Sequence, residues 1–217
     1  LKKNKGKELL ETTLSTLVPY IKHSKNIRFA GDNYSAAWIK ESEKRKLPNI
    51  KKSVYSYNAL KSPQTVKAFE GVLTKEELIS RYEIQMEIYA HTVNIEAKTI
   101  LDIFNTQILP AAFTQQKKNA EALSLTKELL GSKHLKQQTQ RLTDLTAAIE
   151  KGISLANALE SQRKKIEALT IEKQAFAFCD KIFPQINTLR EVCDFLETLV
   201  DDALWPLPKY RELMYLI

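Results

Sequence analysis

Apolar residues recur every three or four positions along the stretch from Thr74 to Leu130. This interval is typical of a helix with one apolar face, and Thr74 and Glu77 have the spacing of a capping box that would begin it. An unbroken helix of about 57 residues would span roughly 85 Å, so the pattern predicts a long helical arm with a kink at Pro110. The apolar positions of its first part are Leu78, Tyr82, Met86, Tyr89, Val93, Ala97, Ile100, Phe104 and Ile108.

A second long helix is expected to return along the first and form a helical hairpin. Gly131 favours a helix end, and Ser132 is a plausible N-cap for the next helix. Steps of seven, three and four residues then give a coiled-coil-like seam, in which Gly152 marks either a close approach or a weak point. The charged run 162–165 is either a shallower turn or a solvated stretch. The seam consists of Leu135, Leu142, Leu145, Ile149, Ile153, Ala156 and Leu159.

The same periodicity predicts a third long helix over 176–199, interrupted at Pro184. Before Thr74 the pattern is more broken. Residues 7–23 favour an amphipathic helix, 26–31 a turn or strand-like link, and 48–61 an irregular segment. Two further short helices are expected there, one capped by Ser35 and running over 38–46, and one capped by Ser62 and closing at Gly71.

These patterns define an all-α fold. Long antiparallel helices form a helical hairpin or bundle, and a small, mostly helical segment with irregular links precedes them. We expect three segments: a basic segment 1–73, a long-helix bundle extension 74–203, and an apolar docking tail 204–217. In the tail, prolines stop the helix, and so apolar an end is expected to pack into a groove of the same chain or of a neighbour. Its expected docking residues are Trp205, Pro206 and Tyr210.

Charge is distributed unevenly along the chain. Residues 1–73 contain 15 Lys and Arg against 6 Asp and Glu, whereas residues 74–217 contain 18 against 20. A basic first third could meet nucleic acid, but its lysines form no aromatic-basic ladder, so we expect no nucleic-acid partner. No run of apolar residues is long enough to cross a membrane. The two cysteines, Cys179 and Cys193, are separated by too much helix to pair, which fits a cytoplasmic protein.

The sequence contains no recognisable catalytic, cofactor-binding or metal-binding motif. Phosphate loops, zinc-protease helices, nucleophile elbows and paired-cysteine motifs are all missing. Glu83 and Glu87 share one helix face, but without histidines nearby a metal site is not expected. Polar residues do interrupt the apolar stretch, and we interpret them as buried links that fix helix register rather than as chemistry. Those singled out are Arg81, Tyr82, Asn94 and Glu96.

Several blocks of residues stand in a distinctive order. The first are Gly-Asp-Asn-Tyr-Ser from Gly31, then Trp38, then Arg-Lys-Leu-Pro-Asn-Ile from Arg45, and the last is Trp-Pro-Leu-Pro-Lys-Tyr-Arg-Glu-Leu from Trp205. Between them lie 59–62, 71–74, 80–84, 94–97, 108–111, 182–184, 189–190 and 196–200. In this order and spacing they resemble the C-terminal region of type III glutamine synthetases. The resemblance covers nearly the whole chain, although 113–175 matches in helical character more than in residues.

The resemblance implies a parent enzyme that joins ammonia to glutamate through γ-glutamyl phosphate, with ATP and Mg²⁺ or Mn²⁺. The active-site motifs of that family lie before the matched region, so no catalytic, cofactor or metal residue is carried onto this chain, and the chain alone is expected to lack ligase activity. The family commonly has a glycine near position 46, where this chain has Lys46.

The family also assembles as double-ringed oligomers. The implied partners are therefore the upstream catalytic region of the same protein and further copies. We expect the first half of the arm, with Arg81, Tyr82, Asn94 and Glu96, to pack against that catalytic part, and its second half to pair with the returning helix. Two alternatives stay open: a stand-alone helical scaffold without enzyme activity, and a basic nucleic-acid-binding protein.

Overall fold

The computed structural model describes residues 8–29 and 31–214 of the chain. These residues form helices, turns and links without a strand, which confirms the all-α prediction. They divide into two compact units, Leu1–Lys51 and Lys52–Ile217. The division falls well before Thr74, because residues 52–73 pack with the long helices.

The first unit contains two helices, α1 (Leu9–His23) and α2 (Ala36–Lys44), with a 3₁₀ turn η2 (Ser24–Ile27) after α1. Ser35 caps α2 as predicted, because its Oγ accepts a hydrogen bond from the Trp38 amide over 3.3 Å. The ring of Phe29 stacks on Trp38 with centroids 4.6 Å apart. Of the link expected over 26–31, residues 26–27 belong to the turn η2, Arg28 is extended, and residue 30 lies outside the described residues.

The backbone at the end of α2 shows why a glycine would suit position 46, where this chain has Lys46. Lys46 has a φ of 56°, the only positive φ at a non-glycine residue in the described part of the chain. The Leu47 amide donates to the Ser42 carbonyl, and the Lys46 amide donates to the Glu43 carbonyl. This pair of bonds is a Schellman motif, whose left-handed position favours glycine. Lysine therefore occupies a backbone conformation that costs about 1 kcal/mol or more for an L-residue with a side chain.

The second unit opens with short helical turns in place of most of the expected irregular segment. They are α3 (Ser53–Ser56), the 3₁₀ turn η3 (Tyr57–Lys61) and α4 (Pro63–Ala68). The prediction for 48–61 was thus wrong from Ser53 onward, because Val54 is fully buried and holds the segment against the core of the unit. Ser62 caps α4 with Pro63 at its first position, as predicted.

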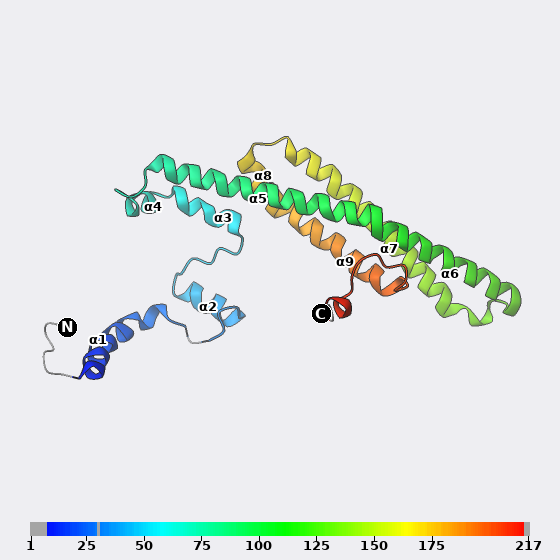
Figure 1. Ribbon diagram of the computed structural model, residues 1–217, viewed down its shortest axis with the longest axis horizontal. Helices are drawn as coiled ribbons and strands as arrows, with labels where there is room; N and C mark the ends of the chain where they lie inside the picture. Colours follow the sequence, from blue (N-terminus) through cyan, green and yellow to red (C-terminus); the bar gives the residue numbers. More distant parts are fainter. Residues whose placement is uncertain (1–7, 30, 215–217) are drawn as a thin grey trace. The chain divides into compact units, whose positions relative to one another are not determined.

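The body of the second unit consists of three long helices, each running antiparallel to the one before it (Figure 1). The first comprises α5 (Lys75–Ile103), η4 (Phe104–Ile108) and α6 (Leu109–Leu130), 56 residues in all. The second is α7 (Lys136–Glu167), and the third comprises α8 (Ile171–Ala177), η6 (Phe178–Ile182) and α9 (Phe183–Leu199). A last short helix, α10 (Tyr210–Met214), follows.

The ends of these helices follow the predicted signals in most places. Thr74 and Glu77 form the complete capping box, and Gly131 ends α6 with a φ of 71°. Ser132 is not the N-cap of the next helix; it begins a 3₁₀ turn, η5 (Ser132–His134), and α7 follows without a side-chain cap. The run 162–165 is not a turn either, because α7 continues through it to Glu167.

Pro110 and Pro184 do not break their helices. Each lies two residues after a π-helical turn, in which the Leu109 amide donates to the Phe104 carbonyl and the Phe183 amide donates to the Phe178 carbonyl. In a regular α-helix a proline ring would clash with the carbonyl four residues earlier. The wider π turn moves that carbonyl away, so the predicted interruptions become continuous helix.

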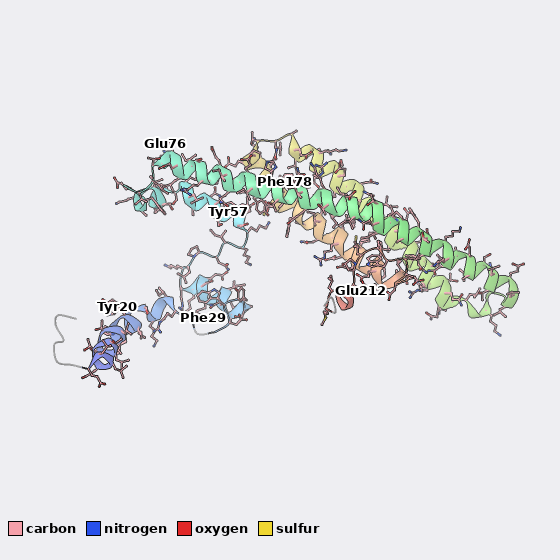
Figure 2. All side chains as sticks on the ribbon, in the orientation of Figure 1. Tyr20, Phe29, Tyr57, Glu76, Phe178 and Glu212 are labelled. Carbon is pink, nitrogen blue, oxygen red and sulfur yellow. The ribbon has the colours of Figure 1, made fainter. Side chains whose placement is uncertain are left out.

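The core of the second unit lies where the three helices meet. Phe104 and Phe178, the first residues of the two π turns, are fully buried in it, and Figure 2 shows Phe178 inside the bundle. Gly152 of α7 faces Phe104 so closely that a Cβ on it would lie 2.7 Å from the Phe104 Cζ. Of the two predicted alternatives for Gly152, the close approach is therefore confirmed. The second half of the arm, α6, pairs with α7 as expected.

Candidate functional site

A buried arginine links two of the long helices. Arg163 of α7 is 6% exposed, and its guanidinium holds Glu160 through two nitrogens over 2.8 and 2.9 Å. Its Nη1 donates to Glu167 over 2.6 Å and to Asn94 Oδ1 of α5 over 3.2 Å. Asn94 Nδ2 in turn donates to Glu167 over 3.0 Å, and Lys98 Nζ lies 3.4 Å from the same carboxylate. We call these residues the Arg163 network.

The network changes the ionisation of its carboxyls. Hydrogen bonds from Arg163, with its positive charge beside them, lower the pKa of Glu160 to about 2. The pKa of Glu167 is also lowered, chiefly by the hydrogen bond from Asn94 and then by the charge of Arg163. Both carboxylates therefore stay ionised at neutral pH, and their bonds stabilise the register of α5 against α7.

A second polar link joins α5 to α8. The Tyr82 hydroxyl donates to Glu172, and Lys61 lies 3.0 Å from the same carboxylate and 4.0 Å from the Tyr82 ring centroid. These two hydrogen bonds lower the pKa of Glu172. A parallel link uses Asp180, which accepts from Lys52 over 2.5 Å and from the Tyr55 hydroxyl. Both links fasten the short helices before α5 to the third long helix.

The four polar residues predicted on the arm thus separate into two kinds. Tyr82 and Asn94 turn inward and bond to α8 and α7 of the same chain. Arg81 and Glu96 are exposed and point away from the core. The sequence reasoning missed Arg163, although a signal for it exists in the spacing. Alternating steps of four and three residues place it on the buried side of α7, in the series Leu145, Ile149, Gly152, Ala156, Leu159, Arg163 and Ile166.

The first residues of the predicted docking tail pack on their own unit, whereas Leu213 and Met214 are 51% and 77% exposed and residues 215–217 lie outside the described part of the chain. Trp205 is 9% exposed and belongs to the core cluster, whereas Pro206 beside it is exposed. Trp205 and Leu207 line a hollow of about 380 Å³, together with Ile100 of α5 and Cys193 of α9. Tyr210 begins α10. The tail was expected to pack into a groove of the same chain or of a neighbour, and Trp205 packs into the same chain.

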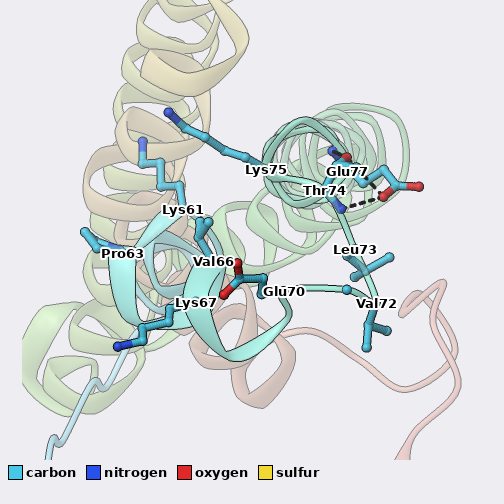
Figure 3. A pocket seen from close by; sticks show the side chains of 11 residues that line it. Lys61, Pro63, Val66, Lys67, Glu70, Val72, Leu73, Thr74, Lys75 and Glu77 are labelled. Carbon is cyan, nitrogen blue, oxygen red and sulfur yellow. Dashed lines mark hydrogen bonds between the residues drawn. The ribbon is translucent and has the colours of Figure 1, made fainter.

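A larger hollow of about 910 Å³ lies between α4 and the start of α5 (Figure 3). Its wall carries Lys61, Lys67 and Lys75, and also Glu70 and Glu77. Glu77 accepts the hydrogen bond of the capping box, and Lys61 forms an ion pair with Glu172. The opening is therefore a bend of the chain bordered by mixed charges, and no acid–base pair or nucleophile converges on it.

Metal-binding groups do not converge elsewhere in the described residues. Over 8–29 and 31–214, no three His, Cys, Asp or Glu side chains come together as metal ligands do. Within the same ranges, no helix has the length and apolar character needed to cross a membrane. The side chains that stand out are instead apolar ones in contact with solvent.

The most extended of these apolar faces lies on α1. Its large apolar side chains are 43–73% exposed, and Tyr20 projects from the same helix (Figure 2). Within the described residues of the first unit, 8–29 and 31–51, nothing covers this face. Exposed contiguous apolar surface of this kind marks an interaction site. The face consists of Leu9, Leu10, Leu14, Leu17, Val18 and Ile21.

The fold defines a class of protein: an all-α helical domain whose helices are fastened to one another by ion pairs. The sequence profile of one family, described as the glutamine synthetase C-terminal domain, matches residues 13–127. The chain belongs to this family.

Relatives agree with the assignment. A type-3 glutamine synthetase of Dictyostelium discoideum is 31% identical over 212 residues, which is 93% of this chain and 28% of that protein. A glutamine synthetase of Bacteroides fragilis (strain YCH46) is 30% identical over 200 residues, 88% of this chain and 27% of that protein. One of Butyrivibrio fibrisolvens is 27% identical over 214 residues. The chain thus spans little more than a quarter of the length of these relatives.

Proposed function

We propose that this chain is the non-catalytic C-terminal part of a glutamine synthetase of type III. The parent reaction is the formation of glutamine, ADP and phosphate from ATP, glutamate and ammonia. The role of this part is to pack against the catalytic part and to contribute to assembly of the oligomer in the cytoplasm. The observation that carries the proposal is the match of most of the chain to just over a quarter of each synthetase.

The chemistry of the described residues fits a supporting role. ATP and Mg²⁺ or Mn²⁺, the cofactors implied for the parent, would need a cluster of carboxylates, and none of the described carboxyls forms one. The strongly perturbed carboxyls, Glu160 and Glu167, are engaged with Arg163 between helices. We therefore route no step of the reaction through this chain.

The exposed face of α1 is the surface that we assign to the catalytic part. Burying a leucine side chain contributes roughly 1.5–3 kcal/mol, so leaving six large apolar residues in water would be unfavourable. The first unit, which carries this helix, also contains the blocks that resemble the segment after the catalytic core. These two features together support our assignment of the contact with the rest of the synthetase to α1.

Co-purification tests the proposal. The 217-residue chain and a separately expressed catalytic part of the same synthetase are mixed and passed over a sizing column, and glutamine formation is assayed for each and for the mixture. We expect the chain alone to form no glutamine and to co-elute with the catalytic part. The double substitution Leu14→Asp and Leu17→Asp should abolish co-elution, because two charges would enter an apolar contact.

The matched control adds the same charge to the polar side of α1, as Ser15→Asp with Thr16→Asp, and should leave co-elution intact. Circular dichroism of both variants checks that α1 remains helical. If the chain never associates with the catalytic part, or if both variants behave alike, the packing role is wrong and a stand-alone scaffold becomes the better reading.

A further inference from the structure

The long helix α5 has a second seam on the side away from the core. Seven residues follow one another at alternating steps of three and four, the spacing of a coiled-coil seam. This seam lies roughly 180° round the helix from the buried residues Tyr82, Met86 and Val93, at 100° per residue. We call it the outer seam, and it consists of Arg81, Ile84, Ile88, His91, Ile95, Lys98 and Asp102. Lys98 lies at the edge of this seam, where it also reaches Glu167 of α7.

The centre of the outer seam is apolar and exposed. Ile84, Ile88 and Ile95 are 49%, 53% and 64% exposed. β-branched residues are weaker helix formers than alanine or leucine, so local helix propensity does not explain three isoleucines here. Apolar residues repeated at heptad spacing on an open helix face are what a partner helix requires.

One pair of isoleucines and one pair of opposite charges are arranged symmetrically along this seam. Ile88 and Ile95 lie equally many residues before and after the midpoint between residues 91 and 92. Arg81 and Asp102 are likewise equally far from that midpoint along the sequence. An antiparallel copy of the same helix would therefore place Ile88 against Ile95 and Arg81 against Asp102, twice over. Among the described residues, neither Arg81 nor Asp102 has an ion pair within 4 Å.

We infer that the outer seam pairs with the same seam of a second copy of this chain, antiparallel and about a two-fold axis near His91. A two-fold contact requires one surface that is complementary to itself, and the order of charges meets this requirement. The paired region from Arg81 to Asp102 would extend over roughly 31 Å. The inference rests on the proposed function, because it names the partner and the surface for the assembly role.

A charge exchange tests the pairing. The oligomeric state of the 217-residue chain is measured by sedimentation across micromolar concentrations. We expect a dimer for the unsubstituted chain. Arg81→Asp and Asp102→Arg should each weaken dimerisation at least about tenfold, because each places like charges in contact. The double variant should recover the original affinity within about threefold, since the two ion pairs re-form with opposite polarity.

A cross-link tests the position of the axis. His91→Cys should form a covalent dimer under mild oxidation, because the two-fold brings residue 91 close to its own copy, as a disulfide requires. Glu83→Cys is the control, since residue 83 is exposed on the same helix but lies about 100° away from Ile84. The native Cys179 and Cys193 are buried and should not contribute.

Three results would overturn the pairing: a monomer at all concentrations, a charge exchange that does not recover affinity, or equal cross-linking of both cysteine variants. A catalytic part that competes for the seam would also contradict it. The α1 variants of the co-purification experiment do not touch α5. Loss of pairing with co-purification intact therefore rejects this inference alone, and loss of co-purification with pairing intact rejects only the packing role.

Discussion

Arg163 Nη1 on α7 and Asn94 Oδ1 on α5 lie 3.2 Å apart, and both side chains also bond to Glu167. Arg163 is thus a cation inside a seam of apolar residues, and its partners occupy all three guanidinium nitrogens. Such an arrangement fixes the axial register of α5 against α7, because only one register brings these groups together.

Removal of Arg163 should therefore destabilise the bundle. We expect Arg163→Ala to lower the free energy of unfolding by about 2 kcal/mol. This is less than the roughly 3–5 kcal/mol for fully buried pairs, because Glu160 and Glu167 are each about one-third exposed. Urea denaturation followed by circular dichroism measures this. Lys164→Ala, the exposed neighbour, should change the value by no more than about 0.5 kcal/mol.

The same network predicts acid sensitivity. Glu160 has a folded-state pKa of about 2, below its ordinary value. A carboxyl of this kind stabilises the fold at any pH above its unfolded-state pKa, and the contribution is lost as the pH falls from about 4.5 toward 2. The lowered pKa of Glu167 acts in the same direction. Melting temperatures at pH 7, 4.5 and 3 should fall steeply only over the last interval. In Arg163→Ala that fall should be smaller, and an unchanged fall would exclude the network as its source.

Gly152 is expected to tolerate no side chain. Alanine would gain about 1 kcal/mol in helix propensity, but its Cβ would lie 2.7 Å from the ring of the fully buried Phe104. Overpacking of this kind costs about 1–3 kcal/mol, so the net effect should be destabilisation by about 1 kcal/mol. The double variant Gly152→Ala with Phe104→Leu provides the check. If the clash is the cause, alanine should cost less in that background than with Phe104 in place.

Lys46→Gly should stabilise the end of α2. Glycine reaches a φ of 56° without the side-chain cost, so a gain of about 1 kcal/mol is expected. Hydrogen exchange at the Leu47 amide, which donates to the Ser42 carbonyl, should slow by about fivefold. Lys44→Gly, inside the helix, should have the opposite effect. Faster exchange in Lys46→Gly would contradict the strain argument.

Trp205 should protect Cys193, since both line the same hollow. Burial raises the pKa of the Cys193 thiol to about 11, so it should react slowly with a thiol reagent at pH 8. Trp205→Ala should destabilise the unit by about 3 kcal/mol and increase the rate of labelling at Cys193 more than at Cys179. Mass spectrometry of the labelled peptides separates the two. Equal acceleration at both would indicate general unfolding instead.

Signals that act within four residues made much of the fold predictable. Ser35, Ser62 and Thr74 cap their helices through side chains that reach the next turn, and Gly131 ends one through its own backbone. The polar contacts between helices were less accessible. Tyr82 and Asn94 were recognised as polar interruptions, but their partners Glu172 and Glu167 lie 90 and 73 residues away along the chain.

The π turns were missed for a different reason. Pro110 was expected to kink its helix and Pro184 to interrupt its own, because a single proline carries no information about the turn before it. The two segments share Phe, Ile and Pro at the same spacing, Phe104–Pro110 and Phe178–Pro184. Comparison of these segments with each other would have suggested a common local structure for both.

The π turn at Phe104–Ile108 also sets a rotational phase. An extra residue in a helix turns everything after it by about 100° relative to an uninterrupted helix. At 100° per residue this shift brings Ala112, which is fully buried, onto the same side as the buried residues of α5. Deletion of one residue from the turn would restore a regular α-helix with the buried side of α6 still toward α7, but it would return the ring of Pro110 to its clash with the carbonyl four residues earlier. The π turn therefore keeps one face of the long arm continuous across an extra residue and at the same time makes room for the proline.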